Sequence, residues 1–381
     1  MKVNKLLIMI YVLLMLSCVY ASERYTYVIV PRGYNNYSPI IRIDSYGRFT
    51  SNGQRIYEAV DNFIHYDPEQ KYIWLYVNKD PFLGLKQYEI TNYGQLTETG
   101  RHIDGDFGYG VFISETPNHE LLFVEGNDFR IYKLYPDGSF ETTANNCYGD
   151  YRPGYLNISP RGDIIMSQNI KPYKFQIHTI DYKEPSLSIS TVCMIDTSNV
   201  VYTVNGNAVF TSGGDYVAFT VMGMGGKSLA VYKINADSSL DTTFCEYLLG
   251  TLIAINLSIT PDNKYIYISS EGTPKGILRV DWNSNTKRYV DNGYYMPLDR
   301  PINLKVTPDG KLLIVVWQYQ GYAIYRLKSY RILNNGDLED TGYVYNYSDI
   351  EGDMIPISWP LQFLWPQAAT DVPRELWREL D

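Results

Sequence analysis

The amino-acid sequence predicts an all-β fold, a seven-bladed β-propeller of four-stranded antiparallel blades, from three observations. A short phrase, in which two apolar runs flank residues such as Thr-Pro-Asp-Gly, occurs six times. Its copies recur about every 48 residues, which suits a blade of four strands. A second phrase, an apolar strand followed by a polar turn, comes after the first.

Each copy of the first phrase is expected to form a β-hairpin. The clearest copies are SITPDNKYIYISS from Ser258 and KVTPDGKLLIVVW from Lys305. Proline presets the first turn position, Asp-Gly or Asp-Asn tolerates the reversal, and β-branched and aromatic residues favour strands on both sides. The run at 312–317 is almost continuously apolar, as expected for a strand covered on both faces. In the copy from Val209, we place Gly213 where the others have proline.

The second phrase predicts the third and fourth strands of each blade. It reads FRIYKLYPDGSFETT from Phe129 and LAVYKINADSSLDTT from Leu229. Gly, Asp and Asn between two strands are typical of a hairpin turn. The two phrases together therefore supply four strands per repeat.

The two ends of the chain are expected to share one blade. PIIRIDSYGRFTSNG from Pro39 is a third-strand phrase, but no Pro-Asp hairpin precedes it, and the apolar segment MIPISWPLQFLW from Met354 follows the last repeat. We predict that this segment is the missing innermost strand and closes the ring, which removes exposed sheet edges. The propeller would then span residues 22–365, and residues 366–381 would form a C-terminal tail.

Residues 1–21 are predicted to be a signal peptide. Two lysines precede an apolar segment of about 15 residues, and cleavage is expected after Ala21. Two alternatives stay open: an uncleaved membrane anchor, although the apolar run is short for one, and lipidation at Cys18. The protein is therefore expected to be secreted or associated with the cell envelope, in the periplasm or outside the cell.

The composition limits the classes of partner. The formal net charge is −9 and no Lys/Arg cluster offsets it, which argues against nucleic acid and against anionic membranes. Membrane contact is expected only through an N-terminal anchor, and the protein is expected to be a monomer. The 37 tyrosines, against 13 phenylalanines, suit sugar stacking or a protein interface, although propeller strands also accept tyrosine readily.

No cofactor and no metal are expected. The cysteines beyond the signal peptide have no CxxC spacing and no nearby histidine set, so they are expected to form one disulfide and a free thiol, or to stay reduced and partly buried. These cysteines are Cys147, Cys193 and Cys245.

Alternating carboxylates at residues 349–353 could bind calcium, but they match no calcium-loop signature and are also typical of a solvated acidic loop.

The hairpin phrase at residues 307–311 and the Asp-Gly-x-Phe phrase at residues 137–140 resemble those of a known group. The group comprises the seven-bladed lactonase-like propellers, with the bacterial phosphogluconolactonases, and surface propellers with YVTN-type repeats. The resemblance covers nearly the whole chain after the signal peptide. It implies His, Arg and Glu at the channel mouth, on the segments just ahead of the Pro-Asp turns. This chain has no histidine there, and only Arg152 and Arg300 match.

Arg152 and Arg300 are expected near the mouth of the central channel, because each lies just before an inner strand. Arginine there could bind the carboxylate or phosphate of a sugar acid, or form an ion pair between blades. Asn157 and Asn303 could add hydrogen bonds to a ligand, or satisfy backbone groups between blades.

The candidates for catalysis are His102, Asp104 and Asp106. His102 is expected in a loop just before an inner strand, where the two carboxylates could pair with it at the channel mouth. The other histidines have no ligand or catalytic spacing: His65, His119 and His178.

The sequence favours an exported propeller that binds a carbohydrate-like small molecule or a protein partner, without catalysis. The alternative is a lactonase-like hydrolase that opens a sugar lactone, with Arg152 and Arg300 holding the anion and His102 or an acidic neighbour activating water. A redox propeller is a third class, but no CxxCH motif supports it.

Overall fold

The computed structural model describes strands and turns distributed over most of the chain. The described residues are 26–29, 38–56, 60–66, 72–79, 82–91, 95–105, 112–116, 120–125, 129–135, 137, 139–141, 153–169, 174–183, 186–196, 208–220, 229–248, 254–319, 324–346 and 362–364. Within these ranges the regular secondary structure is entirely β, and no helix is long and apolar enough to cross a membrane. The predicted all-β class is confirmed.

The described strands form seven four-stranded antiparallel sheets. The sheet that contains both chain ends has the order β28 (Gln362–Leu364), β1 (Thr26–Ile29), β2 (Ser38–Ile43) and β3 (Phe49–Ile56). The next three sheets are β4 (Val60–Tyr66), β5 (Tyr72–Lys79), β6 (Phe82–Ile90), β7 (Leu96–Asp104); β8 (Phe112–Glu115), β9 (Leu121–Glu125), β10 (Phe129–Leu134), β11 (Phe140–Glu141); and β12 (Pro153–Ile158), β13 (Ile164–Asn169), β14 (Lys174–Lys183), β15 (Ser186–Asp196). The last three are β16 (Ala208–Phe210), β17 (Tyr216–Thr220), β18 (Leu229–Ile234), β19 (Leu240–Leu248); β20 (Ala254–Ile259), β21 (Tyr265–Ser270), β22 (Gly276–Asn283), β23 (Arg288–Pro297); and β24 (Pro301–Val306), β25 (Leu312–Tyr319), β26 (Ile324–Ile332), β27 (Leu338–Asn346).

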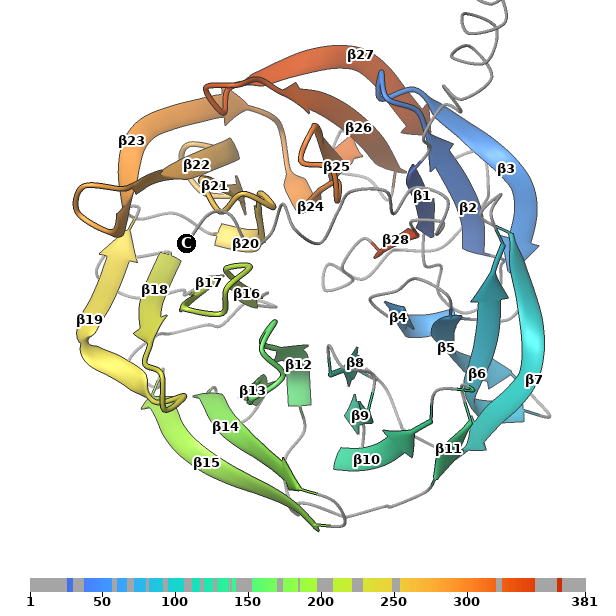
Figure 1. Ribbon diagram of the computed structural model, residues 1–381. Helices are drawn as coiled ribbons and strands as arrows, with labels where there is room; N and C mark the ends of the chain where they lie inside the picture. The colour runs from blue at the N-terminus through green and yellow to red at the C-terminus, as the bar shows by residue number, and fades with distance from the viewer. Residues whose placement is uncertain are drawn as a thin grey trace, which may run out of the picture.

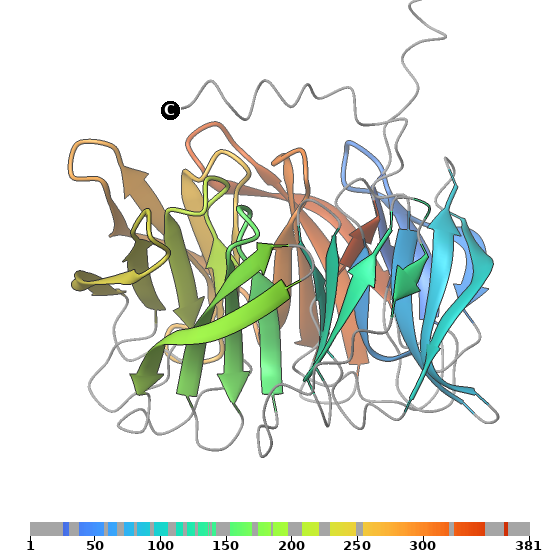
Figure 2. The ribbon, with the colours of Figure 1, turned by 60° about the horizontal axis from the view of Figure 1, so that its bottom comes forward.

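The sheets are arranged around a common centre, as in a β-propeller (Figure 1). The first strand of each repeat, such as β24, lies nearest the centre, and the fourth, such as β27, lies at the periphery. The turns that join first to second strands and third to fourth strands lie at one end of the fold, the upper edge in Figure 2. We call this the turn end.

The Thr/Ser-Pro-Asp-Gly phrase forms the turn between the first two strands, as predicted. In the last sheet, Thr307 Oγ1 accepts a hydrogen bond from the Leu312 backbone N–H at 3.0 Å and donates to Asp309 Oδ1 at 2.7 Å. The Gly310 N–H closes the turn by donating to the Thr307 carbonyl at 2.8 Å. Gly310 has a φ of +70°, a conformation that favours glycine. The same hydroxyl-to-backbone bond recurs at Thr116, Ser159, Thr211 and Thr260.

The repeat alignment at Gly213 is corrected by one residue. Thr211 Oγ1 accepts the Tyr216 N–H at 3.1 Å, so Thr211 is the counterpart of Thr307. Ser212 therefore holds the place of the proline, and Gly214, with a φ of +74°, holds the place of Gly310. The sequence pattern misled because two adjacent glycines leave the position of the tight reversal ambiguous.

The hydrophobic core lies between neighbouring sheets rather than at the centre of the fold. One cluster joins Val231 to Ile266 and Ile268 of the next sheet, and all three are at most 1% exposed. Such burial on both faces explains the continuous apolar runs of the second strands. It also makes each sheet depend on its neighbours for stability.

The first and last sheets also pack against each other. Ile41 of β2 shares a buried cluster with Ile302 and Ile314 of the last sheet. Ser329 Oγ, in β26, donates to the Gly47 carbonyl at 2.7 Å. Of the segment from Met354, the structure describes β28, which pairs antiparallel with β1 and has Leu364 opposite Tyr27. The predicted signal peptide and C-terminal tail lie outside the described residues.

Candidate functional site

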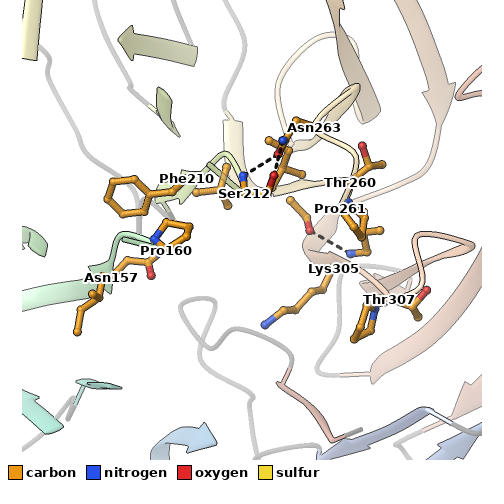
Figure 3. Close-up of a pocket in the computed structure, with 15 residues that line it drawn as sticks. Asn157, Pro160, Phe210, Ser212, Thr260, Pro261, Asn263, Lys305 and Thr307 are labelled. Atoms are coloured by element: carbon orange, nitrogen blue, oxygen red, sulfur yellow. Dashed lines mark hydrogen bonds between the residues drawn. The ribbon is translucent and has the colours of Figure 1, made fainter. Parts of the chain in front are cut away.

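A cavity of about 390 Å³ lies at the turn end, where four consecutive sheets meet (Figure 3). Each sheet contributes the end of its first strand and the turn that follows: β12, β16, β20 and β24. The volume falls at the lower end of the range typical of small-molecule sites.

One strand position supplies three of the polar side chains that line this cavity. It lies two residues before the turn hydroxyl and is occupied by Asn157, Val209, Ser258 and Lys305. Asn157 Nδ2 donates to the Ala208 carbonyl of the next sheet at 2.8 Å. Ser258 Oγ likewise accepts the Val306 N–H of the next sheet at 3.0 Å. Asparagine and serine at this position therefore reach across to the neighbouring first strand.

The rim of the cavity is fixed by a reciprocal pair of bonds between two turns. The Ser212 N–H donates to Asn263 Oδ1 at 2.8 Å, and Asn263 Nδ2 donates to Ser212 Oγ at 2.6 Å. Both bonds are drawn in Figure 3. Because both residues line the cavity, this pair holds its wall in one geometry.

Lys305 is the one titratable side chain among the residues that line the cavity. Figure 3 shows it extending from β24 towards the side of the cavity that Asn157 and Pro160 line. Burial lowers the pKa of the Lys305 amine to about 8, because the charged form loses solvation. At pH 7 the amine is still mostly protonated, so the cavity carries a poorly solvated positive charge.

The remaining walls of the cavity are largely apolar. Phe210 and Val306 contribute side chains, and three turn prolines cover the rim: Pro160, Pro261 and Pro308. Apolar walls with a few polar groups are the usual make-up of a small-molecule site. The arrangement can hold a small ligand that has one anionic or strongly accepting group.

Arg300, a predicted ligand-binding residue, lies at the opposite end of β24. Its guanidinium Nη1 donates to Gln318 Oε1 at 3.1 Å, and its backbone has a φ of +45°. In an extended strand, the step from residue 300 to residue 305 spans about 16 Å between Cα atoms. Arg300 is not among the residues that line the cavity.

The two predicted asparagines differ in position. Asn157 lines the cavity and also bonds to the next sheet, so the expectation that it satisfies a backbone group between blades is confirmed. Asn303 is 2% exposed, lies in the middle of β24 and is not among the residues that line the cavity. Arg152, the other predicted cation, lies outside the described residues.

His102 does not lie in a loop beside an inner strand, as expected, but in β7, the outermost strand of its sheet. The prediction failed because β7 continues through the polar residues after Gly100, so the loop begins later. His102 is exposed, with its Nε2 3.7 Å from Asp104 Oδ1 and its Nδ1 3.3 Å from the Gly100 carbonyl. Asp106 lies outside the described residues.

Two further histidine positions are defined. His178 lies in β14, where burial lowers its pKa to about 4, so it is neutral at pH 7. His65 lies in β4 opposite Trp74. His119, Cys147 and residues 349–353 lie outside the described part of the chain, and within that part no group of three His, Cys, Asp or Glu residues could hold a metal ion.

Tyr294, in β23, has a structural role. The Arg279 guanidinium lies over its ring, 4.4 Å from the centroid, and also over Tyr265 at 5.0 Å. Arg279 bonds to Asp281 at 2.6 Å and to Asp337 of the next sheet at 3.0 Å. The abundance of tyrosine here reflects contacts between sheets.

Sequence reasoning missed Lys305 and Ser258 as site residues. A signal was present: the repeats, aligned on the turn Thr or Ser, have Asn157, Ser258 and Lys305 at one strand position. A lysine in an otherwise buried first strand departs from that pattern and could have been noticed.

No protein-family model and no curated protein matches this chain. Several solved structures share its fold. A candidate 6-phosphogluconolactonase from Bacteroides uniformis has a TM-score of 0.68 at 15% identity, covering 90% of this chain and 100% of its own. The periplasmic gluconolactonase PpgL of Pseudomonas aeruginosa has a TM-score of 0.63 at 12% identity, covering 89% of this chain and 99% of its own. At these identities the likeness establishes the β-propeller fold alone.

Proposed function

We propose that this protein is an exported β-propeller that binds a small, carbohydrate-related molecule in the cavity at the turn end. The observation that carries the proposal is the cavity itself, which four consecutive sheets build around a single amine. The two hydrogen bonds between Ser212 and Asn263 and the apolar walls give a preformed site, and binding to a preformed site costs little conformational entropy.

The proposal includes a closed ring of seven blades. Pairing of β28 with β1 and the cluster that joins Ile41 to Ile314 support closure between the first and last sheets. A closed ring leaves no unpaired sheet face and holds the first strands in register around the cavity. Export rests on the predicted signal peptide at residues 1–21.

Ligand-observed NMR of residues 22–381 against a library of sugars, sugar acids and lactones tests the proposal. We expect at least one hit, lost in Val209→Trp, because indole would fill the cavity. Val344→Trp, on the exposed outer strand, is the matched control and should leave binding intact. Ser212→Trp, at the exposed rim, replaces Val209→Trp in this test if Val209→Trp does not fold. The proposal is refuted if no library member binds, or if binding is unaffected by both cavity variants.

The second candidate function is a lactonase-like hydrolase, favoured by the fold shared with PpgL and the Bacteroides uniformis protein. Here Arg300, which precedes β24, would hold the anion together with Arg152. A pH-stat assay on sugar and aromatic lactones tests it. Turnover lost in Arg152→Ala/Arg300→Ala, but retained in Arg331→Ala on the exposed edge, would support it. No turnover across the panel would exclude it for those substrates.

A protein partner is the remaining expectation for a binding module. Its most direct support is the exposure of large apolar side chains at the periphery, Leu333, Tyr343 and Val344, which are 39–40% exposed. Isolated exposed residues of this kind are common on soluble proteins, so we favour the small-molecule site.

A further inference from the structure

We propose that residues 372–380 of this chain bind in the cavity at the turn end, with Trp377 as the anchor, and thereby regulate access to it. This segment belongs to the predicted C-terminal tail and lies outside the described residues. Its competition with a ligand rests on the proposed function, whereas its binding to the cavity does not. The inference follows from where β28 ends, from the length of the chain beyond it and from the side chains of the segment.

The topology of the first sheet brings the chain out of β28 at the turn end. The turn from β2 to β3 lies at that end and is closed by the Gly47 N–H, which donates to the Asp44 carbonyl at 2.9 Å. β28 and β2 both run antiparallel to β1, so β28 also runs towards the turn end. Leu364 lies opposite Tyr27, which lies opposite Arg42, two residues before that turn. The chain therefore leaves β28 at the same end as the cavity.

The exit point lies one sheet away from the cavity. β24 lines the cavity, and its sheet packs against the first sheet through Ile314 and Ile41. Packed sheets lie about 10 Å apart. Trp377 is 13 residues beyond Leu364, and that length of chain spans up to about 43 Å when extended. The connection is therefore long enough to reach the cavity even when it is bent.

The segment carries a group of large apolar side chains. Val372, Leu376, Trp377 and Leu380 lie within nine consecutive residues. Removing one large apolar side chain from water shifts an equilibrium by a factor of about ten or more. A segment of this composition therefore favours an apolar recess close to its point of attachment.

The cavity supplies such a recess. Phe210, Ile259, Val306 and the three turn prolines line its walls, and its volume of about 390 Å³ accommodates an indole ring. Buried tryptophan usually finds an acceptor for its N–H, and the Asn157 amide oxygen, in the same lining, can accept that bond. The walls and this acceptor together suit the side chain of Trp377.

Attachment to β28 makes binding of the segment an intramolecular event. A tether of this kind gives an effective concentration in the millimolar range, so modest affinity is enough to keep the cavity occupied. A ligand then binds only to the fraction of molecules in which the cavity is open, and its apparent affinity falls in proportion. The segment would act as a competitor built into the chain.

Fluorine NMR of residues 22–381 labelled with 5-fluorotryptophan tests the inference, with the Trp377 resonance assigned by its loss in Trp377→Phe. We expect a soluble gadolinium chelate to relax this resonance about tenfold less in the wild type than in Val209→Phe, whose ring occupies the cavity. Ser212→Phe, at the rim, replaces Val209→Phe if that variant does not fold. Leu333→Ala, in an exposed turn at the same end, is the matched control and should leave the protection unchanged.

The NMR library of ligands supplies a second readout. A ligand that is lost in Val209→Trp should bind Trp377→Ala about tenfold more tightly than the wild type, because the segment no longer competes for the cavity. Gln367→Ala, in the connection between β28 and the segment, is the matched control and should leave the affinity unchanged.

Four results would overturn the inference. The first two are equal relaxation of Trp377 in the wild type and Val209→Phe, and protection that Leu333→Ala removes, which would place the segment at the periphery. The others are protection that falls on dilution, which would indicate a second copy of the chain, and a cavity ligand whose affinity Trp377→Ala does not change. If Trp377 is protected as expected but no library member binds, the inference stands and the proposed function fails. If a ligand binds in the cavity while Trp377 is exposed, the reverse holds.

Discussion

A cationic side chain lies near each end of β24, and the two have different surroundings. At the start of the strand, the Arg300 guanidinium bonds to Gln318 of the adjacent strand, within its own sheet. Near the other end, Lys305 extends into a cavity that four sheets share. A cation that bonds within its own sheet stabilises that sheet, whereas a cation desolvated between sheets lowers stability.

The largest expected effect concerns that cost. Lys305→Met should stabilise the protein at pH 7 by up to about 3 kcal/mol, because it removes an amine whose pKa burial lowers to about 8. Between that pKa and about 10.4, the unfolded chain binds a proton that the folded one lacks, so wild-type stability rises with pH. The advantage of the variant should therefore shrink across this window and vanish above it.

Urea unfolding of both proteins from pH 7 to pH 10.5 measures this difference, and other titrating groups cancel between them. A variant less stable than the wild type at pH 7, or an advantage independent of pH, would show that Lys305 is not desolvated.

A second change tests the turn beside Lys305. Thr307→Val should lower the free energy of unfolding by about 2 kcal/mol, because it leaves the Leu312 N–H without the hydroxyl acceptor at 3.0 Å. Denaturant unfolding at pH 7 measures it, with Thr97→Val on the exposed outer strand β7 as control. An equal loss in both variants would mean that the buried hydroxyl bond contributes nothing specific.

At the start of β24, Arg300→Ala should cost about 1 kcal/mol, the contribution of one hydrogen bond to Gln318. Thermal unfolding at pH 7 measures this loss. An unchanged unfolding midpoint in Arg300→Ala would contradict a contribution of the Gln318 bond to stability.

The smallest effect is expected at Lys311, in the exposed turn. Its amine lies 4.0 Å from Asp309 and its side chain is 72% exposed, so the pair is screened by water. Lys311→Met should change the free energy of unfolding by less than about 0.5 kcal/mol. The same urea titration measures it, and a larger change would contradict the assignment of this lysine to solvent.

Much of the fold was predictable because the repeat encodes local chemistry. Thr307, Pro308 and Gly310 each satisfy a requirement of one turn, so their order identifies a hairpin wherever it occurs. The copy with Gly213 shows the limit of this reading. Two glycines satisfy the reversal in either of two registers, and only the Thr211 hydroxyl bond to Tyr216 distinguishes them.

The candidate site was less predictable, because it lies between repeats rather than within one. His102 could not be placed from the sequence, since an exposed outer strand and a loop share the same polar composition. Asn157 was identified as a polar residue in an inner strand, but its partner, the Ala208 carbonyl, lies in the next sheet. Contacts of this kind depend on how the sheets stack.

The sequence by itself determined the all-β class, the hairpin turns and the apolar runs, because each depends on residues close together in the chain. The tertiary structure alone decided that Asn157, Ser258 and Lys305 line one cavity while Arg300 does not. The physical reason is that packing between blades brings equivalent strand positions together across about 50 residues of sequence per blade, and it removes water from Lys305.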